Sequence, residues 1–249
     1  MKTYPFKHSV LVTAIGLLAA PAIAADLPTY QQPVAAAQAA PYDWTGFYAG
    51  IHAGAAFADS NTGTDLDGYN SLGEVVPLSS ETDFIGGAQA GYNWQINSFV
   101  FGIEADISYL GYDASDSSAF FGGDTTYRAQ TDWFATIRGR GGFAFNNVLI
   151  YATGGVAFSD LEYSVSDTVL APPGINAISA STSEDVGWTI GGGVEYAPNQ
   201  RWTLKGEYLY AEFDGGTATG VAAVGGGTFN FLFGDTQFNI VRIGANYRF

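Results

Sequence analysis

Residues 99–110 read Phe-Val-Phe-Gly-Ile-Glu-Ala-Asp-Ile-Ser-Tyr-Leu, and their side chains alternate between two kinds. Apolar side chains occupy every second position from 99 to 109, and Gly102, Glu104, Asp106 and Ser108 lie between them. Successive side chains of a β-strand point to opposite faces of a sheet. A period of two therefore predicts a strand with one apolar and one polar face.

The same period recurs along the chain after Trp44. Eight segments carry it: 47–57, 83–94, 99–110, 131–145, 148–158, 185–196, 201–212 and 237–249. The connections after the second, fourth and sixth segments are short, whereas the other four run to roughly twenty residues and are rich in Gly, Ser, Thr and Asp. Tight turns at one end and long loops at the other are typical of outer-membrane barrels. We therefore predict an all-β, eight-stranded antiparallel up-and-down transmembrane β-barrel.

The direction of the apolar faces separates this fold from a soluble ligand-binding barrel, which would turn its aromatic rings inward. Eight strands enclose a space only just wide enough for side chains, and the large rings of the apolar faces would overfill it. These rings are Phe84, Trp94, Phe99, Tyr109, Trp133, Trp188, Tyr196, Trp202, Tyr208 and Tyr247. We expect the apolar face to meet lipid and the polar face to line a narrow lumen. Segment 148–158 is apolar on both faces, so its facing stays unassigned.

The start of the chain differs from the rest. Residues 1–25 combine two lysines, an apolar run over 10–20 and small residues at 22 and 24, which are features of a cleaved secretory signal peptide. Residues 26–42 are rich in Pro, Ala and Gln without periodicity, which predicts a flexible periplasmic segment. The outer-membrane barrel domain is expected to cover residues 43–249.

The composition excludes several kinds of chemistry. The chain has 24 acidic residues, 9 basic residues and no cysteine, and removal of the signal peptide gives a net charge of −17. The lack of cysteine excludes disulfides, thiolate catalysis, cysteine zinc sites and iron–sulfur clusters. So acidic a chain cannot replace the counterions of nucleic-acid phosphates, so we expect no nucleic-acid partner. The sequence predicts no metal site and no cofactor.

Most basic residues of the mature chain fall on the polar faces of the predicted strands, together with several acids. We expect a paired charge network in the lumen made of Glu104, Asp106, Arg138, Arg140, Glu195, Lys205, Glu207, Arg242 and Arg248. Buried charges are tolerated when they are paired and hydrogen-bonded, so this network predicts a structural plug. The alternative is a charged pore lining.

An enzymatic role would need a general base beside a nucleophile or an activated water. The mature chain has one histidine, His52, which the alternation places in the lumen as a hydrogen-bonded residue. We predict no catalytic residue and no enzyme.

The long connections 58–82, 111–127, 160–183 and 213–236 contain thirteen acids and no base. We expect mobile external loops whose charge keeps the protein soluble and repels anionic neighbours. Divalent cations bridging these acids to lipopolysaccharide phosphates are the alternative, although no loop has the regular Asp spacing of a calcium site.

Several stretches together carry a family resemblance. They are WTGFYAG at 44–50, GIEAD at 102–106, DWFATIRGR at 132–140, YATGG at 151–155, GWTIGGGVEY at 187–196, KGEYLY at 205–210 and RIGANYRF at 242–249. The chain resembles the small outer-membrane β-barrel family of alphaproteobacteria, the porin-like major surface proteins of rhizobial and brucella-type envelopes. The resemblance implies location in the outer membrane of a Gram-negative bacterium. It also implies a closing strand whose terminal aromatic residues, here Tyr247 and Phe249, are read by the barrel-assembly machinery.

Within that family some relatives are reported to bind haemin and others are called porins. Haem would need an axial ligand, and the long connections offer tyrosines, among them Tyr69, Tyr112 and Tyr127, but no histidine. We therefore expect a structural barrel that supports envelope integrity and presents acidic loops. Its expected partners are outer-membrane lipid, lipopolysaccharide and the barrel-assembly machinery. A narrow porin or a haemin-binding surface protein is the alternative, and a homo-oligomer is left open.

Overall fold

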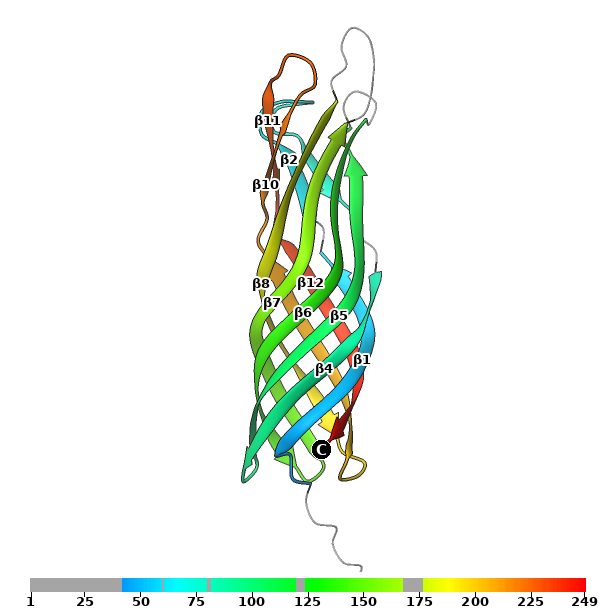
Figure 1. Cartoon of the computed structure of the whole chain (residues 1–249), viewed down its shortest axis with the longest axis vertical. Coiled ribbons are helices and arrows are strands. Elements are labelled where there is room, and N and C mark those ends of the chain that lie inside the picture. Colours follow the sequence, from blue (N-terminus) through cyan, green and yellow to red (C-terminus); the bar gives the residue numbers. More distant parts are fainter. Residues whose placement is uncertain (1–41, 60, 80–81, 120–123, 168–176) are drawn as a thin grey trace, which may run out of the picture. The chain divides into compact units, whose positions relative to one another are not determined.

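The computed structural model describes residues 42–249 except 60, 80–81, 120–123 and 168–176. The predicted signal peptide lies outside this part, as does all of the predicted periplasmic segment except Tyr42. Within the described residues, no helix is long and apolar enough to cross a membrane. The strands (Figure 1) are β1 (Gly46–Ala58), β2 (Asn61–Asp65), β3 (Val75–Leu78), β4 (Thr82–Ile96), β5 (Phe99–Ser117), β6 (Thr125–Phe145), β7 (Val148–Asp167), β8 (Ile178–Tyr196), β9 (Trp202–Phe213), β10 (Thr217–Val221), β11 (Thr228–Phe233) and β12 (Thr236–Arg248).

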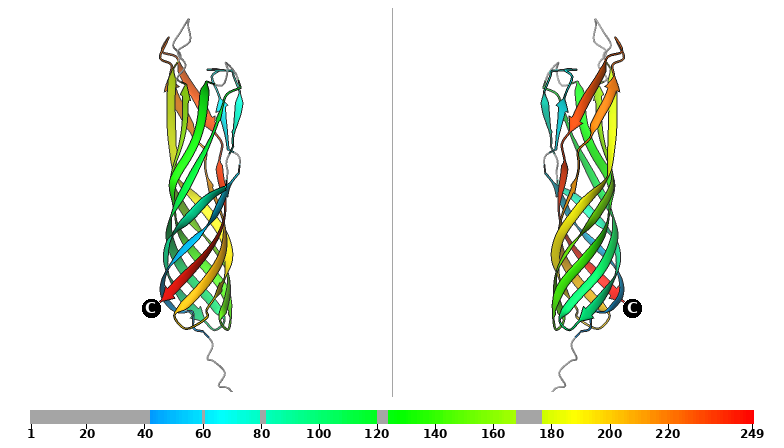
Figure 2. Two further views of the ribbon diagram at one scale, coloured as in Figure 1. Left: turned by 90° about the vertical axis from the view of Figure 1, so that its right-hand side faces the viewer. Right: turned by 90° about the vertical axis from the view of Figure 1, so that its left-hand side faces the viewer.

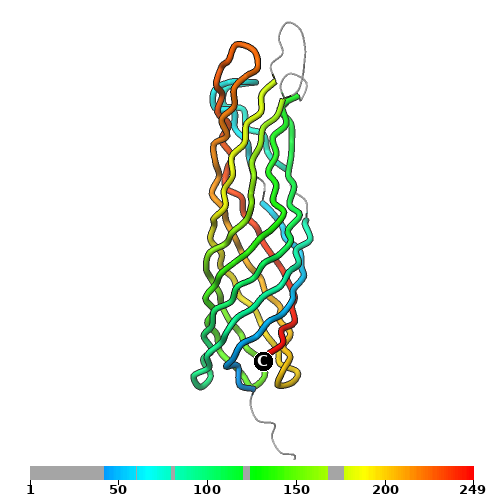
Figure 3. Tube along the Cα trace, in the orientation of Figure 1, coloured from blue at the N-terminus to red at the C-terminus, as the bar shows by residue number. Residues whose placement is uncertain are grey.

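Eight strands close into one antiparallel barrel in the order β1-β12-β9-β8-β7-β6-β5-β4. They cover the eight segments that the alternation predicts, except for Arg201 and Phe249 at two ends, and the predicted fold class is confirmed. The ring closes where β1 pairs with β12, with Gly50 opposite Asn246 (Figure 3). A Cβ on Gly50 would lie 2.3 Å from the carbonyl oxygen of Ala245, so glycine permits the close approach of these two strands.

Short connections join the barrel strands at one end, which we call the turn end. Asn97 and Asn146 occupy two of these turns with positive φ angles of 55° and 54°, a conformation that asparagine tolerates better than most residues. The chain reaches its last residue, Phe249, at this end. We call the opposite end of the barrel the loop end.

A band of exposed apolar side chains surrounds the barrel. On β5, the outward side chains of Phe99, Phe101, Ile103, Ile107 and Tyr109 are 51% to 60% exposed. Aromatic rings lie at both edges of the band: Phe47, Trp94, Phe99, Phe145, Tyr196, Trp202 and Phe249 toward the turn end, and Phe84, Tyr109, Trp133 and Trp188 toward the loop end. This arrangement matches a surface that faces lipid between two interfacial girdles.

The described residues of the long connections lie largely in β-strands, which corrects the expectation of mobile loops for that part of the chain. β5 and β7 continue to Ser117 and Asp167, and β6 and β8 begin at Thr125 and Ile178, so these four strands run far past the predicted segments. The first and last long connections supply β2, β3, β10 and β11, which pair in the order β10-β11-β2-β3. Figure 2 shows this second sheet opposite the extended strands at the loop end.

The two sheets at the loop end enclose a second core, which we call the loop-end core. Its buried side chains come from both sheets and include Val76, Leu78, Leu110, Tyr112, Tyr127, Phe134, Leu161, Tyr163, Val165, Ile178, Phe213, Phe231, Phe233, Phe238 and Ile240. Outward positions beside it are polar, such as Asp113, Ser115 and Glu162. Beyond the apolar band the outer surface meets water, so apolar side chains turn inward.

Three register shifts mark the change from one zone to the other. They fall between Tyr109 and Tyr112 on β5, between Gln130 and Phe134 on β6, and between Phe158 and Leu161 on β7. A bulge places one extra residue against the partner strand. On β6 this changes which side chains face inward, because the buried positions are odd up to Thr131 and even from Phe134 on, whereas on β5 and β7 the same alternate positions stay buried through the shift.

The bulge in β6 overturns one expectation from the alternation. Strict alternation over segment 131–145 predicts Asp132 on the inward polar face with Thr136, but Asp132 is exposed beside Trp133. The Asp160 carboxylate accepts hydrogen bonds from the Thr131 hydroxyl (2.6 Å) and from the backbone N–H of Asp132 (3.1 Å). These bonds satisfy the donors that the bulge removes from the strand ladder.

The structure also assigns the facing of β7. Leu149, Tyr151 and Leu161 are buried inside, whereas Ile150 and Val156 are exposed on the outer band. Both faces are apolar because the inward side passes through apolar packing at each end of the barrel.

Candidate functional site

Charged side chains gather inside the ring because the strand register places opposite charges across from each other. Glu104 on β5 lies opposite Arg138 on β6, and Glu207 on β9 lies opposite Arg242 on β12. Glu195 on β8 lies opposite Lys205 on β9 in the same way. Alternation turns all of these side chains to the inner face, where they meet across the lumen.

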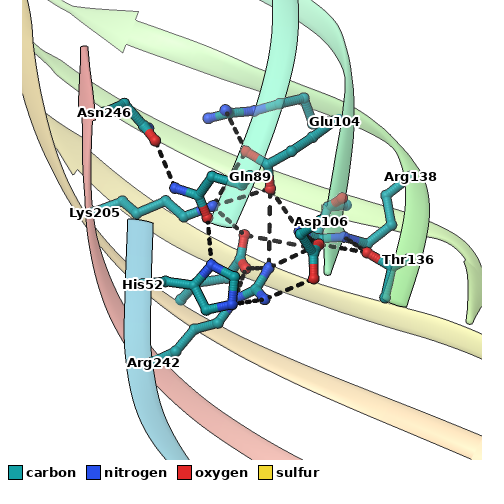
Figure 4. A network of polar contacts seen from close by, with 12 residues as sticks. His52, Gln89, Glu104, Asp106, Thr136, Arg138, Lys205, Arg242 and Asn246 are labelled. Carbon is teal, nitrogen blue, oxygen red and sulfur yellow. Dashed lines mark hydrogen bonds and ion pairs between the residues drawn. The ribbon is translucent and has the colours of Figure 1, made fainter. Parts of the chain in front are cut away.

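The contacts form one connected network (Figure 4). Arg138 Nη2 lies 2.5 Å from Glu104 Oε1 and 3.0 Å from Asp106 Oδ2. Arg242 lies 2.6 Å from Glu207 Oε2 and 3.1 Å from Asp106 Oδ1. These bonds tie β5, β6, β9 and β12 together across the barrel.

Glu104 has the largest share of these contacts. Lys205 Nζ lies 2.9 Å from its Oε1, and Arg140 and Arg242 approach within 3.6 Å and 3.9 Å. The Tyr48 hydroxyl donates a further hydrogen bond to it at 2.8 Å. One carboxylate is therefore shared by four cations, since Arg138 also contacts it.

The network is buried and balanced in charge. It holds four carboxylates and four cations: Glu104, Asp106, Glu195, Glu207, Arg138, Arg140, Lys205 and Arg242. The side chains of these eight residues are at most 3% exposed. Ion pairs so far from water survive only when every charge has partners, and here each has at least one.

Neutral groups complete the network, and sequence reasoning identified only His52 among them. His52 Nδ1 lies 2.9 Å from Gln89 Oε1, and its Nε2 lies 2.8 Å from the Ser108 hydroxyl and 3.3 Å from Arg242. Because arginine only donates, Nε2 accepts and Nδ1 carries the proton, a tautomer inferred from these partners. Gln89 in turn donates to Asn246.

Two tyrosines border the network on its turn-end side. Tyr151 donates to Glu207 at 2.7 Å, and the Arg140 guanidinium lies 4.0 Å from the centre of its ring. Arg140 also donates to the Tyr48 hydroxyl at 2.9 Å and pairs with Glu195 at 2.7 Å. Tyr48 lies on the same face of its strand as His52, so the period of two could have identified it, whereas Tyr151 lies in the segment 148–158 whose facing the alternation left unassigned.

Arg248 was expected in the network, but the structure places it at the turn-end rim. Its guanidinium donates to the backbone carbonyl of Asp43 and lies 5.2 Å from the ring centre of Tyr42. Within the described part of the chain, no carboxylate forms an ion pair with it. Arg248 is the next-to-last residue of the chain, so its side chain reaches the mouth of the barrel rather than its middle.

A small apolar cluster lies beneath the network at the turn end. Tyr42 and Trp44 pack edge to face, with ring centres 4.7 Å apart, and bury against Val100, Leu149 and Tyr151. Tyr42 is the last residue of the segment expected to be flexible, and it is 4% exposed. The interior therefore has three layers in series: this turn-end cluster, the charge network and the loop-end core.

The charge network has little capacity to bind a cation. The described residues contain no group of three or more His, Asp or Glu side chains arranged to hold a metal ion. Each lumen carboxylate already contacts arginine or lysine, so a metal ion would have to displace a buried cation. The arrangement is suited to holding strands together and to filling the lumen.

Comparison with known proteins gives the family and the fold. A family model described as outer membrane protein beta-barrel domain matches residues 33–249. The 31 kDa outer-membrane immunogenic protein of Brucella melitensis biotype 1 is 34% identical over 253 residues, covering 98% of this chain and 100% of the relative. The 22 kDa outer membrane protein of Rhizobium leguminosarum bv. viciae is 30% identical over 170 residues, covering 68% of this chain and 64% of the relative. These matches confirm the family resemblance seen in the sequence.

Solved structures agree at the level of the fold. The outer membrane protease OmpT from Escherichia coli gives a TM-score of 0.51 at 12% identity, over 85% of this chain and 99% of that one. The outer membrane protein OprG from Pseudomonas aeruginosa gives 0.50 at 14% identity, over 84% and 99%. At such low identity, the likeness concerns the barrel alone.

Proposed function

The chain belongs to the outer membrane protein β-barrel family and is located in the outer membrane of a Gram-negative bacterium; from this premise, we propose that it is a structural, non-conducting barrel. Its proposed role is to support the envelope and to present an acidic, folded surface outside the cell. The proposal includes no enzymatic step, in keeping with relatives that are named as immunogenic outer-membrane proteins.

The barrel topology supports an orientation for this role. An even number of strands brings the first and last strands to the same side, which in bacterial outer-membrane barrels is the periplasm, together with the short turns. The turn end then faces the periplasm and the loop end faces the exterior. Asp113, Asp116, Asp160 and Glu162 would lie on the exterior surface.

The layered interior carries the proposal. An eight-stranded ring has room for little besides its own side chains. Here the charge network lies in series with an apolar layer at each end. A hydrated ion would have to open both apolar layers and break buried ion pairs, which argues for a plug rather than the narrow porin that was the alternative.

The haemin-binding alternative also gains little support from the loop end. Tyr112 and Tyr127 are buried in the loop-end core, and burial raises the pKa of both hydroxyls. Partial burial, together with a hydrogen bond donated to Asp167, raises the pKa of Tyr69. Each tyrosine would have to leave its packing and lose a proton to bind haem iron.

Planar-bilayer conductance of the refolded mature protein tests the proposal. We expect the wild-type protein to be silent, and Glu104→Ala and Arg138→Ala to leak only slightly, because both apolar layers remain. Adding Phe231→Ala and Phe233→Ala to Glu104→Ala should increase the leak, whereas adding the exposed Leu232→Ala should not. A steady wild-type conductance whose ion selectivity changes in Glu104→Ala would overturn the plug and make these charges a pore lining.

A further inference from the structure

The outer surface of the barrel has a hollow that the proposed function does not explain. It is a groove of about 600 Å³ over β1, β4 and β5 toward the turn end. Its floor is the cross-strand row of Ala49, Ala90 and Ala105, which lie side by side in the register. Larger outward side chains surround the row: Phe47, Tyr92, Ile103, Ile137 and Phe249.

A second, polar hollow of about 400 Å³ lies at the adjacent turn-end rim. Gln200, Arg201, Tyr247 and Arg248 line it together with Phe249, which also borders the apolar groove. The ring of Phe249 therefore separates an apolar trough on the lipid-facing wall from a polar recess at its edge. Trp202 and Tyr247 pack edge to face beside it, with centres 5.2 Å apart, as interfacial aromatic residues.

Arg201 and Arg248 give the polar recess its charge, and the Arg248 guanidinium already contacts the Asp43 carbonyl and the Tyr42 ring. Four of the seven basic residues in the chain after position 25 are inside the network, and Arg128 pairs with Asp113 at the loop end. Arg201 is exposed, and it forms no ion pair with any carboxylate of the described residues. In so acidic a chain, an exposed arginine without an ion pair beside an aromatic girdle is placed to meet an anion at the membrane interface.

We propose that this surface binds one glycerophospholipid of the leaflet at the turn end. One acyl chain lies in the groove over Ala49, Ala90 and Ala105, and the phosphate lies at Arg201, with Phe249 between the two parts. A flexible hydrocarbon chain fits a trough with a smooth alanine floor and bulky walls. The phosphate supplies the negative charge that pairs with Arg201.

This occupant fits better than a second copy of the chain. A second barrel could fill the apolar trough with its own side chains, but it would bring the same cationic rim and add like charge beside Arg201. A phospholipid satisfies both hollows with one molecule. The proposal concerns the outer wall, so its failure would leave the plugged lumen untouched.

Native mass spectrometry of the refolded full-length mature barrel tests the site with two probes. Dioleoylphosphatidylglycerol carries two acyl chains and a phosphate, and dioleoylglycerol carries the same chains without the phosphate. We expect the wild-type protein to retain one phosphatidylglycerol more strongly than diacylglycerol. Arg201→Gln should lower retention of the phospholipid about threefold and leave diacylglycerol unchanged. Arg128→Gln, which changes an arginine at the loop end, is the matched control.

A second variant tests the groove itself. Ala90→Leu with Ala105→Leu fills the floor and should lower retention of both probes by about fivefold or more. Ala152→Leu enlarges an exposed alanine of β7 outside the groove and should change neither. Unchanged heat-dependent migration on gels shows that each variant has folded.

Three results would overturn the proposal. Equal losses of phospholipid in Arg201→Gln and Arg128→Gln would show that the phosphate does not bind at Arg201. Unchanged retention of both probes in the Ala90→Leu, Ala105→Leu variant would show that the acyl chain does not lie in the groove. A wild-type dimer that carries neither probe, and that the groove-filling variant abolishes, would make the site an interface between two copies.

Discussion

Glu104 is the residue on which the interior charges depend, because four cations contact its carboxylate. Removing one partner of a buried ion pair leaves an uncompensated charge, which is far more costly than losing an exposed pair. Its neighbours Arg138 and Lys205 have side chains with no exposed surface, so water cannot replace the missing carboxylate.

We expect Glu104→Gln to lower the free energy of unfolding by about 3 kcal/mol or more, measured by urea unfolding in lipid vesicles. Asp113→Asn removes the exposed pair with Arg128 and should cost less than about 1 kcal/mol. Combining Glu104→Gln with Lys205→Gln restores the charge balance and should recover part of the loss. Equal effects of Glu104→Gln and Asp113→Asn would contradict the buried network.

Asp160 holds the β6 bulge and gives the loop end a pH dependence. Burial alone would raise the pKa of this carboxyl, but hydrogen bonds from the Thr131 hydroxyl and from the N–H groups of Asp132 and Trp133 outweigh it and hold the pKa below its ordinary value. A depressed folded-state pKa stabilises the fold fully above the unfolded value. This stabilisation is lost as the pH falls below that value and through the folded one.

We therefore expect the backbone amides of Asp132 and Trp133 to be better protected from hydrogen exchange in the wild type than in Asp160→Asn at pH 7. The difference should persist just below the ordinary carboxyl pKa of 3.8 and disappear only as the pH falls through the lower pKa of Asp160 in the folded protein. NMR measurement of the amide protection factors at pH 7 and at low pH checks this. Glu162→Asn changes an exposed neighbour and should alter the protection factors little. A difference that grows toward low pH would show the wrong sign for Asp160.

At the scale of the elements, the sequence predicted eight strands and the facing of all but segment 148–158, but not their full length. β1, β4, β9 and β12 agree with the predicted segments within two residues at each end. β5 to β8 extend further because their polarity inverts past the bulges. Leu161, Tyr163 and Val165 alternate with Glu162, Ser164 and Ser166 in the same period of two, so a signal for the extension was present.

That signal was obscured by the physical change at the edge of the apolar band. On the turn-end side of the bulges the apolar side chains face outward, and on the loop-end side they face inward. A search for strands whose apolar side chains stay on one face therefore ends at the bulge. The second sheet was harder to anticipate, since β2, β3, β10 and β11 have four to six residues each and pair across long stretches of sequence. Of the charges expected inside, Arg248 lies at the turn-end rim and Asp132 lies exposed beside the β6 bulge.

The second sheet should depend on the loop-end core for its order. Phe231 is fully buried, with ring centres 6.1 Å and 5.9 Å from Tyr69 and Tyr127. The cavity left by Phe231→Ala should lower the free energy of unfolding by about 3 to 5 kcal/mol. We expect faster hydrogen exchange in β2, β10 and β11, with the part of β12 from Arg242 to Arg248, which lies outside the loop-end core, unchanged. Leu232→Ala, on the exposed face of the same strand, should leave exchange as in the wild type; equally fast exchange in the wild type would contradict an ordered sheet.

At the scale of the whole molecule, the polarity of the interior and the exterior is reversed between the two zones of the chain. Inside the apolar band the core is polar and the exterior apolar, and beyond it the core is apolar and the exterior polar. Both follow from the medium outside, lipid in the first zone and water in the second. The loop end is thus a folded, acidic body rather than a set of mobile loops. The C-terminal assembly signal at Tyr247 and Phe249 stays a prediction.

The position of Arg242 on the closing strand has a consequence for how the barrel is completed. Strands β5 to β9 carry four carboxylates and three cations of the network, so the open sheet has an excess of negative charge until β12 arrives. Arg242 then reaches Glu207 beside it and Asp106 on the far side of the lumen. The charges of the network therefore balance only when the last strand closes the ring. This balance favours closure of the barrel over an open, half-inserted intermediate.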